Sequence, residues 1–246
     1  MGRTLLGLWT WFSFAAVSAV GYLVCLVVFL LTIVFDPTRR ITGRGIRLVG
    51  VIMVRCVPAW RFRYERPVPA RLPERAVCVS NHCSNIDPFL VAHLPWEMKF
   101  LAKDVLFKIP FVGWGIKLAG DIPLVRGSTH SIKNAMARAA FYVRSGMPVC
   151  IFAEGTRSVT GDLLPFKDGA FRLAIECKAF VVPLAVSGTV DALRKGDWRP
   201  GPARGVVAVG EPIDTAGMTL ADIPVLKERT REAIVRLRAG LAEKSA

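Results

Sequence analysis

No charged residue occurs between Arg3 and Asp36, and this apolar stretch constrains the fold more than any other feature of the chain. It exceeds the roughly 20 residues that a helix needs to cross a bilayer. Its length, and the arginines that follow it, distinguish it from the core of a signal peptide. Trp9 and Trp11 near its start are typical of the membrane–water boundary. We expect a membrane-associated helix over about residues 5–35, which either spans the bilayer or re-enters the same leaflet.

The segment that follows is strongly basic. Residues 38–75 hold ten arginines and two glutamates, a net charge of +8 within the +14 of the whole chain. A second helix is expected over about residues 39–57. Its arginines fall within one narrow stripe of an otherwise apolar surface: Arg40, Arg44, Arg47 and Arg55. The stripe favours a helix that lies among anionic lipid headgroups, with an ordinary helix packed on the globular body as the alternative.

Further expectations follow from the charge and the cysteines. Nucleic acid is the competing partner for so basic a chain, but no nucleic-acid-binding motif is present and the basic segment adjoins the apolar one, so we expect an anionic membrane surface as the partner. The positive-inside rule places the body of the protein on the cytoplasmic side of the inner membrane. The six cysteines show no paired spacing and no Cys/His cluster, so we expect reduced thiols and no metal.

From residue 64 onward, predicted strands alternate with predicted helices. Short apolar runs rich in β-branched residues predict buried strands at residues 76–80, 149–152, 180–186 and 206–209. Helical patterns are found at residues 128–144, at 166–177 and from about 222 onward. This alternation predicts an α/β fold with a mostly parallel mixed sheet flanked by helices. We expect two units, a membrane-associated two-helix segment at residues 1–63 and an α/β domain at residues 64–246.

The first buried strand leads into a segment that holds His82 and Asp87. Asp87 precedes Pro88, which is a helix-start signal with the aspartate as the N-cap residue. Positions five apart on one helix lie about 140° apart, so the two side chains meet only if the chain turns between them. A carboxylate that accepts from one imidazole nitrogen leaves the other nitrogen free as a base. A helix-capping Asp87 and a surface His82 are the alternative.

Two later strand ends carry cations. Arg126 follows a short predicted strand, and Glu154 and Arg157 follow the strand at residues 149–152. If the strands are neighbours, their carboxyl ends share one edge of the sheet, and two cations face the same site as His82. Because arginine binds phosphate oxygens bidentately, this site suits activation of a hydroxyl on a phosphate-bearing substrate. The alternative is that these are surface charges, which contribute little.

Four motifs in order carry a resemblance to a known family. They are Asn81-His82-x-x-x-x-Asp87, Gly120-x-Ile122-Pro123-x-x-Arg126, Phe152-x-Glu154-Gly155-Thr156-Arg157 and Val182-Pro183-Leu184-Ala185. Over residues 76–188 the chain resembles the glycerolipid acyltransferases, with the closest match to the bacterial 1-acyl-glycerol-3-phosphate acyltransferases. Val125 departs from the family, since many members have a polar residue before the arginine. That departure bears on the lipid headgroup and leaves the chemistry unchanged.

The resemblance implies a reaction and roles for named residues. A fatty acyl group passes from acyl-CoA or acyl-carrier protein to the sn-2 hydroxyl of lysophosphatidic acid, giving phosphatidic acid without a cofactor. His82, oriented by Asp87, is then the catalytic base. The implied substrate-binding residues are Lys103, Arg126 and Arg157 for the phosphate, with Glu154, Gly155 and Thr156 beside them. Glu154 then binds the glycerol part or orients an arginine, and residues 111–118 help to seat the acyl chain.

Three alternatives stay open at this point. The acceptor could be another lyso-lipid, such as lyso-ornithine lipid. The protein could instead be a non-catalytic protein that binds anionic membranes through residues 1–63. Cys83, next to His82, also raises the question of a covalent acyl-cysteine route, which requires a thiol of low pKa.

Overall fold

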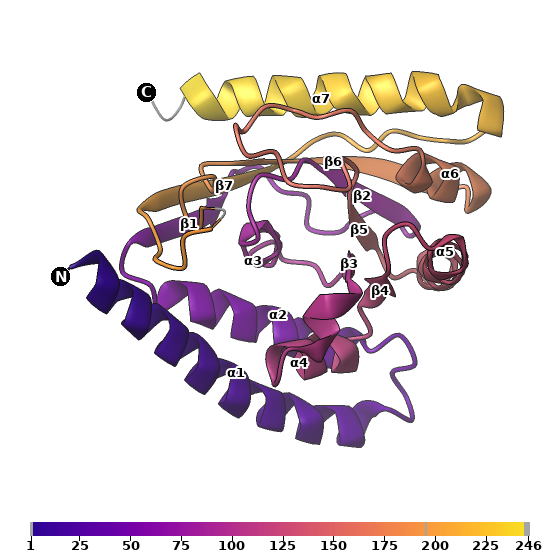
Figure 1. The fold of residues 1–246 in the computed structure, drawn as a ribbon. Coiled ribbons are helices and arrows are strands. Elements are labelled where there is room, and N and C mark those ends of the chain that lie inside the picture. The colour runs from indigo at the N-terminus through magenta and orange to yellow at the C-terminus, as the bar shows by residue number, and fades with distance from the viewer. Residues whose placement is uncertain (1, 195, 244–246) are drawn as a thin grey trace.

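The computed structural model describes residues 2–194 and 196–243, which form a sheet with helices around it (Figure 1). The strands are β1 (Trp60–Tyr64), β2 (Ala76–Ser80), β3 (Lys99–Lys103), β4 (Ile122–Leu124), β5 (Val149–Phe152), β6 (Phe180–Ser187) and β7 (Ala203–Val209). The α-helices are α1 (Arg3–Thr32), α2 (Arg40–Arg55), α3 (Asp87–Val91), α4 (Val112–Leu118), α5 (Thr129–Arg144), α6 (Gly169–Glu176) and α7 (Ile223–Glu243). Two short 3₁₀ helices are η1 (Asp104–Lys108) and η2 (Leu220–Asp222).

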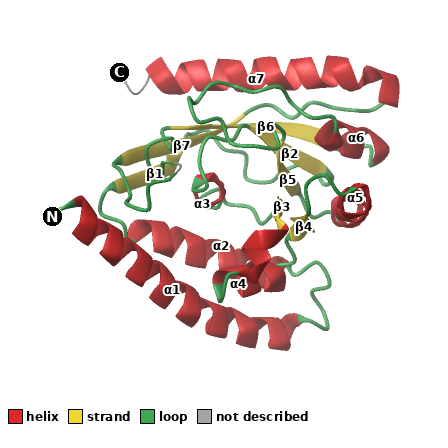
Figure 2. Cartoon of the chain, viewed as in Figure 1, coloured by secondary structure: helices red, strands yellow, loops and turns green. Residues whose placement is uncertain are grey.

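The strands lie in the order β1-β7-β6-β2-β5-β3-β4. Neighbouring strands run parallel, except for the antiparallel pair β6 and β7. The central strand β2 is buried along its whole length. Val77 and Val79 face the core beneath α5, α6 and α7, while Ala76 and Cys78 face the core beneath α3, because successive strand residues point to opposite faces. Helices therefore cover both faces (Figure 2), and the predicted α/β fold is confirmed.

Helix α1 lies along α2, on the face of the sheet opposite α7 (Figure 1). Its buried side is made mostly of small or polar residues: Gly7, Thr10, Ser13, Phe14, Ser18, Cys25 and Thr32. Its exposed side includes Leu23, Val27 and Leu31. A surface helix in water shows the opposite distribution. By length and composition, α1 could cross a membrane.

The predicted arginine stripe on α2 is wrong for Arg47. Its side chain is buried, and its guanidinium donates two hydrogen bonds to the carboxylate of Asp121 and lies 4.6 Å from the ring centroid of Phe100. The helix packs between α1 and the body of the protein, which is the alternative interpretation given above. The acidic partner lies 74 residues away in sequence, so the helical pattern alone could not reveal it.

The other three arginines of the stripe, Arg40, Arg44 and Arg55, are exposed, and their contact with lipid headgroups stays a prediction. The division of the chain at residues 63 and 64 also stays a prediction. Strand β1 lies across that point and pairs with β7 of the sheet.

Candidate active site

The carboxyl ends of four neighbouring parallel strands form one edge of the sheet. Strands β2, β5, β3 and β4 lie side by side, so the residues that follow them are on the same side. His82 follows β2, Lys103 ends β3, Arg126 follows β4 and Glu154 follows β5. These strands therefore meet the condition that their carboxyl ends share one edge of the sheet. This edge is where ligands bind in open α/β sheets.

His82 and Asp87 are in direct contact at this edge. Nδ1 of His82 lies 2.8 Å from Oδ2 of Asp87, and the side chain of Asp87 is fully buried while that of His82 is 15% exposed. The same carboxylate oxygen accepts hydrogen bonds from the backbone N–H groups of Cys83 at 2.6 Å and Ser84 at 2.8 Å. The turn that the spacing requires is therefore present. Among the residues described, none bonds to Nε2 of His82, which leaves this nitrogen free to act as a base.

The predicted role of Asp87 as a helix N-cap is wrong. Helix α3 begins at Asp87 itself, its N-cap residue is Ile86, and no side chain caps it. The carboxylate turns back and binds the backbone of the preceding loop. With His82, Cys83 and Ser84 as donors and Thr189 bonded to its other oxygen, the carboxylate makes more hydrogen bonds than a helix cap would use. The local sequence showed the helix start but could not show this reversal.

The imidazole ring of His82 and its backbone are held by the last residue of β5 and by the segment that follows this strand. The ring stacks on Phe152, with ring centroids 4.2 Å apart and an angle of 26° between the planes. Glu154 Oε1 accepts from the backbone N–H of His82 at 3.0 Å, and Oε2 accepts from Leu164 at 3.3 Å. Ser158 donates its backbone N–H to the carbonyl of His82. The position of His82 is thus fixed on both sides of its Cα atom.

Glu154 is buried, and burial raises its pKa above the ordinary value, although the backbone hydrogen bonds from His82 and Leu164 act in the opposite direction. No arginine lies within ion-pair distance of it in the part of the chain that the structure describes. The contacts of Glu154 are therefore those of a group that positions His82. The roles in glycerol binding or arginine orientation that the resemblance implies stay predictions.

Gly155 follows in a left-handed conformation, with φ at +66°. A Cβ atom at this position would lie 2.8 Å from Cε of the flexible Lys167 side chain, and the left-handed φ is what favours glycine in this turn. The next residue, Thr156, is exposed at the site edge. The glycine therefore allows the chain to reverse directly after Glu154.

Three cations gather at the same edge. Lys103 and Arg126 are exposed and Arg157 is half-buried. The positive charge of Arg126 lowers the pKa of Lys103, together with burial and the charge of Arg157. Within the described residues, no carboxylate forms an ion pair with any of the three. A cluster of like charges without a counterion is unfavourable by itself and is suited to an anionic group such as a phosphate.

Cys83 lies beside the pair but is unsuited to be a nucleophile. Its side chain is buried, and burial, with the negative charge of Asp87, raises the pKa of its thiol to about 11. Because the thiolate is the reactive form, a thiol of this kind is inert at neutral pH. The covalent acyl-cysteine route therefore has no support in the geometry.

Two residues that contact the site were not assigned a role from the sequence. Asn81 forms two hydrogen bonds with the backbone of Val186, at 2.8 and 3.0 Å, and joins the ends of β2 and β6. Thr189 donates its hydroxyl hydrogen to Oδ1 of Asp87. A signal was available for Thr189, since Gly188 directly after a strand favours a sharp turn.

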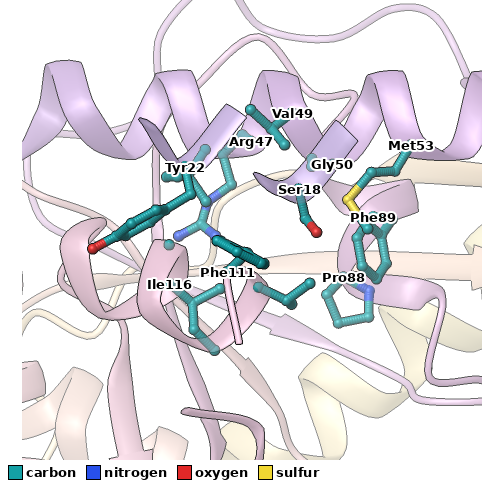
Figure 3. Close-up of a pocket in the computed structure, with 14 residues that line it drawn as sticks. Ser18, Tyr22, Arg47, Val49, Gly50, Met53, Pro88, Phe89, Phe111 and Ile116 are labelled. Atoms are coloured by element: carbon teal, nitrogen blue, oxygen red, sulfur yellow. The ribbon is translucent and has the colours of Figure 1, made fainter. Parts of the chain in front are cut away.

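An apolar cavity of about 90 Å³ lies between α1, α2, α3 and α4 (Figure 3). Pro88, the residue after Asp87, is part of its wall, and Figure 3 shows it facing the cavity together with Phe89 and Phe111. Four residues of the segment 111–118 contribute to the lining: Phe111, Val112, Gly115 and Ile116. The cavity thus lies beside helix α3, which begins at Asp87, and borders the N-terminal helices.

Comparisons with known proteins identify relatives of this chain. A family model described as acyltransferase matches residues 61–187. Human 1-acyl-sn-glycerol-3-phosphate acyltransferase beta is 34% identical over 227 residues, which is 89% of this chain and 77% of the relative. The chloroplastic enzyme LPAT1 of Arabidopsis thaliana, also a 1-acyl-sn-glycerol-3-phosphate acyltransferase, is 32% identical over 71% of this chain and 49% of its own length. A similar chloroplastic protein of Brassica napus matches over 33% of its length, so this chain spans a third to a half of the chloroplastic relatives.

Among solved structures, the 1-acyl-sn-glycerophosphate acyltransferase PlsC of Thermotoga maritima has the same fold. The TM-score is 0.79 at 24% identity, and the match covers 100% of this chain and 98% of that one. The resemblance in the four motifs, the family match over more than half of the residues and the human relative lead to one conclusion. This chain belongs to the acyltransferase family.

Proposed function

We propose that the protein is a 1-acylglycerol-3-phosphate O-acyltransferase. It transfers a fatty acyl group from acyl-CoA or acyl-carrier protein to the sn-2 hydroxyl of lysophosphatidic acid and forms phosphatidic acid. The observation that carries the proposal is the 2.8 Å contact between His82 and Asp87 at a sheet edge that also holds three cations. The reactions named for the human and Arabidopsis relatives support it.

His82 is the general base of the proposed reaction. Its Nε2 atom removes the proton of the substrate hydroxyl, and the resulting alkoxide oxygen attacks the thioester carbonyl. The carbon–sulfur bond then breaks, and the departing sulfur takes the proton from the imidazolium. Asp87 fixes the imidazole tautomer through Nδ1 and stabilises the transient positive charge. The steps use side chains alone, and we expect no metal or cofactor.

The phosphate of the acceptor binds to Lys103, Arg126 and Arg157. All three follow or end strands that lie on one side of β2, in the order β5, β3 and β4, so a phosphate held at this edge places the glycerol hydroxyl near His82. Glu154 acts by accepting a hydrogen bond from the backbone of His82. Gly155 allows the chain to turn directly after Glu154. Thr156, exposed beside them, contacts the glycerol part of the acceptor.

An acyl chain enters the apolar cavity between the N-terminal helices and α4. Pro88 follows the catalytic Asp87 in the chain and also lines the cavity, which supports an acyl chain held there with its carbonyl toward the site. The aromatic side chains of Tyr22 and Phe111, with Ile116, supply the kind of lining that acyl chains prefer. Burial there contributes roughly 0.8 kcal/mol per methylene group.

The protein associates with the membrane through α1, whose large apolar side chains face outward. Both halves of this helix touch the body of the protein: Arg3 pairs with Asp197 at 3.0 Å, and the Tyr22 and Trp114 rings lie 5.6 Å apart. A helix that crossed the bilayer would carry one end away from the body. We therefore favour α1 lying within one leaflet, on the cytoplasmic side of the inner membrane, with the anionic surface attracting the exposed arginines of α2.

An acylation assay tests the proposed function. The full chain, in detergent or in vesicles, is supplied with acyl-CoA or with acyl-carrier protein and with lysophosphatidic acid. We expect phosphatidic acid from the wild type and a rate lower by roughly 10²–10⁴-fold from His82→Ala. His130→Ala, an exposed histidine on α5, is the matched control and keeps wild-type activity.

The same assay separates the alternatives. If lyso-ornithine lipid is acylated faster than lysophosphatidic acid, the acceptor is wrong and the reaction class is kept. If neither donor gives acyl transfer to any lyso-lipid, the enzyme proposal is overturned. If His82→Ala changes nothing while vesicle binding falls with salt, the non-catalytic membrane-binding role is favoured.

A further inference from the structure

Thr189 makes a hydrogen bond to the carboxylate that orients His82. Its Oγ1 atom donates to Oδ1 of Asp87, and its side chain is fully buried. The other oxygen of Asp87 already accepts from His82 and from two backbone N–H groups. Thr189 is the one donor to Oδ1 among the residues that the structure describes. Without it, one oxygen of a buried carboxylate has no partner.

The sheet brings Thr189 to this place. Strand β6 is the parallel neighbour of β2, with Ser80 opposite Leu184, so the residues after both strands lie at the same edge. Gly188 follows β6 with φ at +75°, and an added Cβ atom would lie 2.0 Å from the carbonyl oxygen of Arg204. The chain therefore turns sharply at a glycine and directs Thr189 beneath the site. Asn81 joins the same two strand ends through Val186.

The surroundings also fix the side chain of Thr189 in one orientation. Its methyl carbon lies 3.1 Å from the position that a Cβ atom of Gly205 would take, so that glycine leaves the space which the methyl group fills. The carbonyl of Thr189 accepts from the backbone N–H of Ala192 at 3.0 Å. The hydroxyl is thus held toward Asp87 by packing on one side and by a backbone hydrogen bond on the other.

We infer that Thr189 is a positioning residue, which holds the carboxylate plane of Asp87 so that Oδ2 faces Nδ1 of His82. The inference rests on the proposed acyl transfer. A carboxylate bound at both oxygens cannot rotate about its Cβ–Cγ bond. The imidazole therefore keeps its proton on Nδ1, and Nε2 carries none and can act as the base. Thr189 acts through Asp87 and touches neither substrate.

The test replaces Thr189 by valine, which has nearly the same shape and no hydroxyl. We expect kcat to fall by about 10- to 100-fold, the range found when a hydrogen-bond partner that orients a functional side chain is lost. KM for both substrates stays within about twofold, because the residue contacts neither. Thr189→Ser keeps the hydroxyl and restores most of kcat. Thr230→Val is the matched control, since Thr230 is also fully buried and its hydroxyl donates to Leu226 on α7.

A second measurement does not depend on turnover. Nitrogen NMR spectra of the His82 ring report which nitrogen carries the proton. We expect one tautomer, protonated at Nδ1, in the wild type and in Thr189→Ser, and a mixture in Thr189→Val. A single tautomer in all three proteins overturns the inference.

The outcomes distinguish this inference from the proposed function. An inactive wild type rejects the acyl transfer, and the tautomer measurement still decides the role of Thr189. An active wild type with an equally active Thr189→Val rejects the inference alone. If Thr189→Val lowers the melting temperature more than Thr230→Val does, Thr189→Ser and Thr189→Ala are compared instead. Both lack the methyl group and only serine keeps the hydroxyl, so equal kcat values for these two variants reject the inference.

Discussion

The carboxylate of Glu154 accepts a hydrogen bond from the backbone N–H of His82 across 3.0 Å, which joins two motifs that lie 72 residues apart in the sequence. The acid therefore supports the histidine through its main chain and leaves the imidazole free. Because the same carboxylate also accepts from Leu164, it ties the loop after β5 to the loop after β2. The motif that begins at Phe152 thus has a structural role in the site, in addition to the substrate-binding role proposed for it.

The pH dependence of stability should report the burial of Glu154. Burial raises the pKa of its carboxyl above the ordinary value of 4.5 in the folded state. As the pH rises above about 4.5, the unfolded state loses this proton first, so the folded state binds more protons and is destabilised. We expect the melting temperature of the wild type to fall relative to that of Glu154→Gln between about pH 4.5 and the raised folded value. Glu228→Gln is the control, because Glu228 is an exposed glutamate on α7, and its melting temperature should differ from that of the wild type by the same amount at every pH. The same behaviour of Glu154→Gln would contradict the assignment.

Replacement of Arg126 by alanine should weaken binding of the acceptor. A charge-assisted hydrogen bond to phosphate contributes about 1.5–3 kcal/mol, so kcat/KM for lysophosphatidic acid should fall by roughly 10- to 100-fold. Turnover of a lyso-lipid without phosphate should change little. Arg236→Ala is the control, because Arg236 is a surface residue that pairs with Glu232 on α7. An unchanged preference for the phosphate-bearing acceptor would show that Arg126 does not bind it.

Replacement of Gly50 should change the acyl-chain preference. Gly50 lines the apolar cavity, and an added Cβ atom would lie 3.0 Å from the ring of Phe89. Gly50→Val fills part of the cavity, so activity with long acyl chains should fall by about tenfold or more relative to short chains. Competition between acyl-CoA donors of different lengths measures this ratio. Gly240→Val is the control, because nothing lies within 4 Å of a Cβ atom there. Equal ratios in the two variants would place the acyl chain elsewhere.

Loss of Arg47 should destabilise the whole protein. Burial alone lowers the pKa of Arg47, but the carboxylates of Asp121 and Glu97 outweigh it and raise the pKa above its ordinary value. Removal of one partner of a buried ion pair costs about 3–5 kcal/mol, since the other charge stays buried without compensation. We expect this loss in the free energy of unfolding of Arg47→Met, measured by denaturation in detergent.

Two variants test the cause of that loss. Arg55→Met alters an exposed arginine of the same helix and should change stability by less than about 0.5 kcal/mol. The double variant Arg47→Met/Asp121→Asn should recover part of the loss, because it removes the buried charge that is left unpaired. Equal stabilities of Arg47→Met and Arg55→Met would mean that Arg47 does face lipid or solvent.

The sequence alone determined the class of fold and named the candidate site residues. Strands and helices are encoded by local periodicity, so the alternation from residue 64 onward was sufficient to predict an α/β fold. The apolar stretch after Arg3 and the order of the four motifs are also local features. His82, Asp87 and the three cations could therefore be named before their positions were known.

Only the tertiary structure decided how these residues act on one another. The order of the strands places β6 and β5 on either side of β2, and that order brings Thr189 to Asp87 across 102 residues and Glu154 to the backbone of His82. It also buries Arg47 against Asp121, where a helical pattern had suggested a lipid-facing side chain. The physical reason is that a buried polar group needs hydrogen-bond partners, and the packing of elements distant in sequence supplies them. A local sequence pattern carries no information on those contacts.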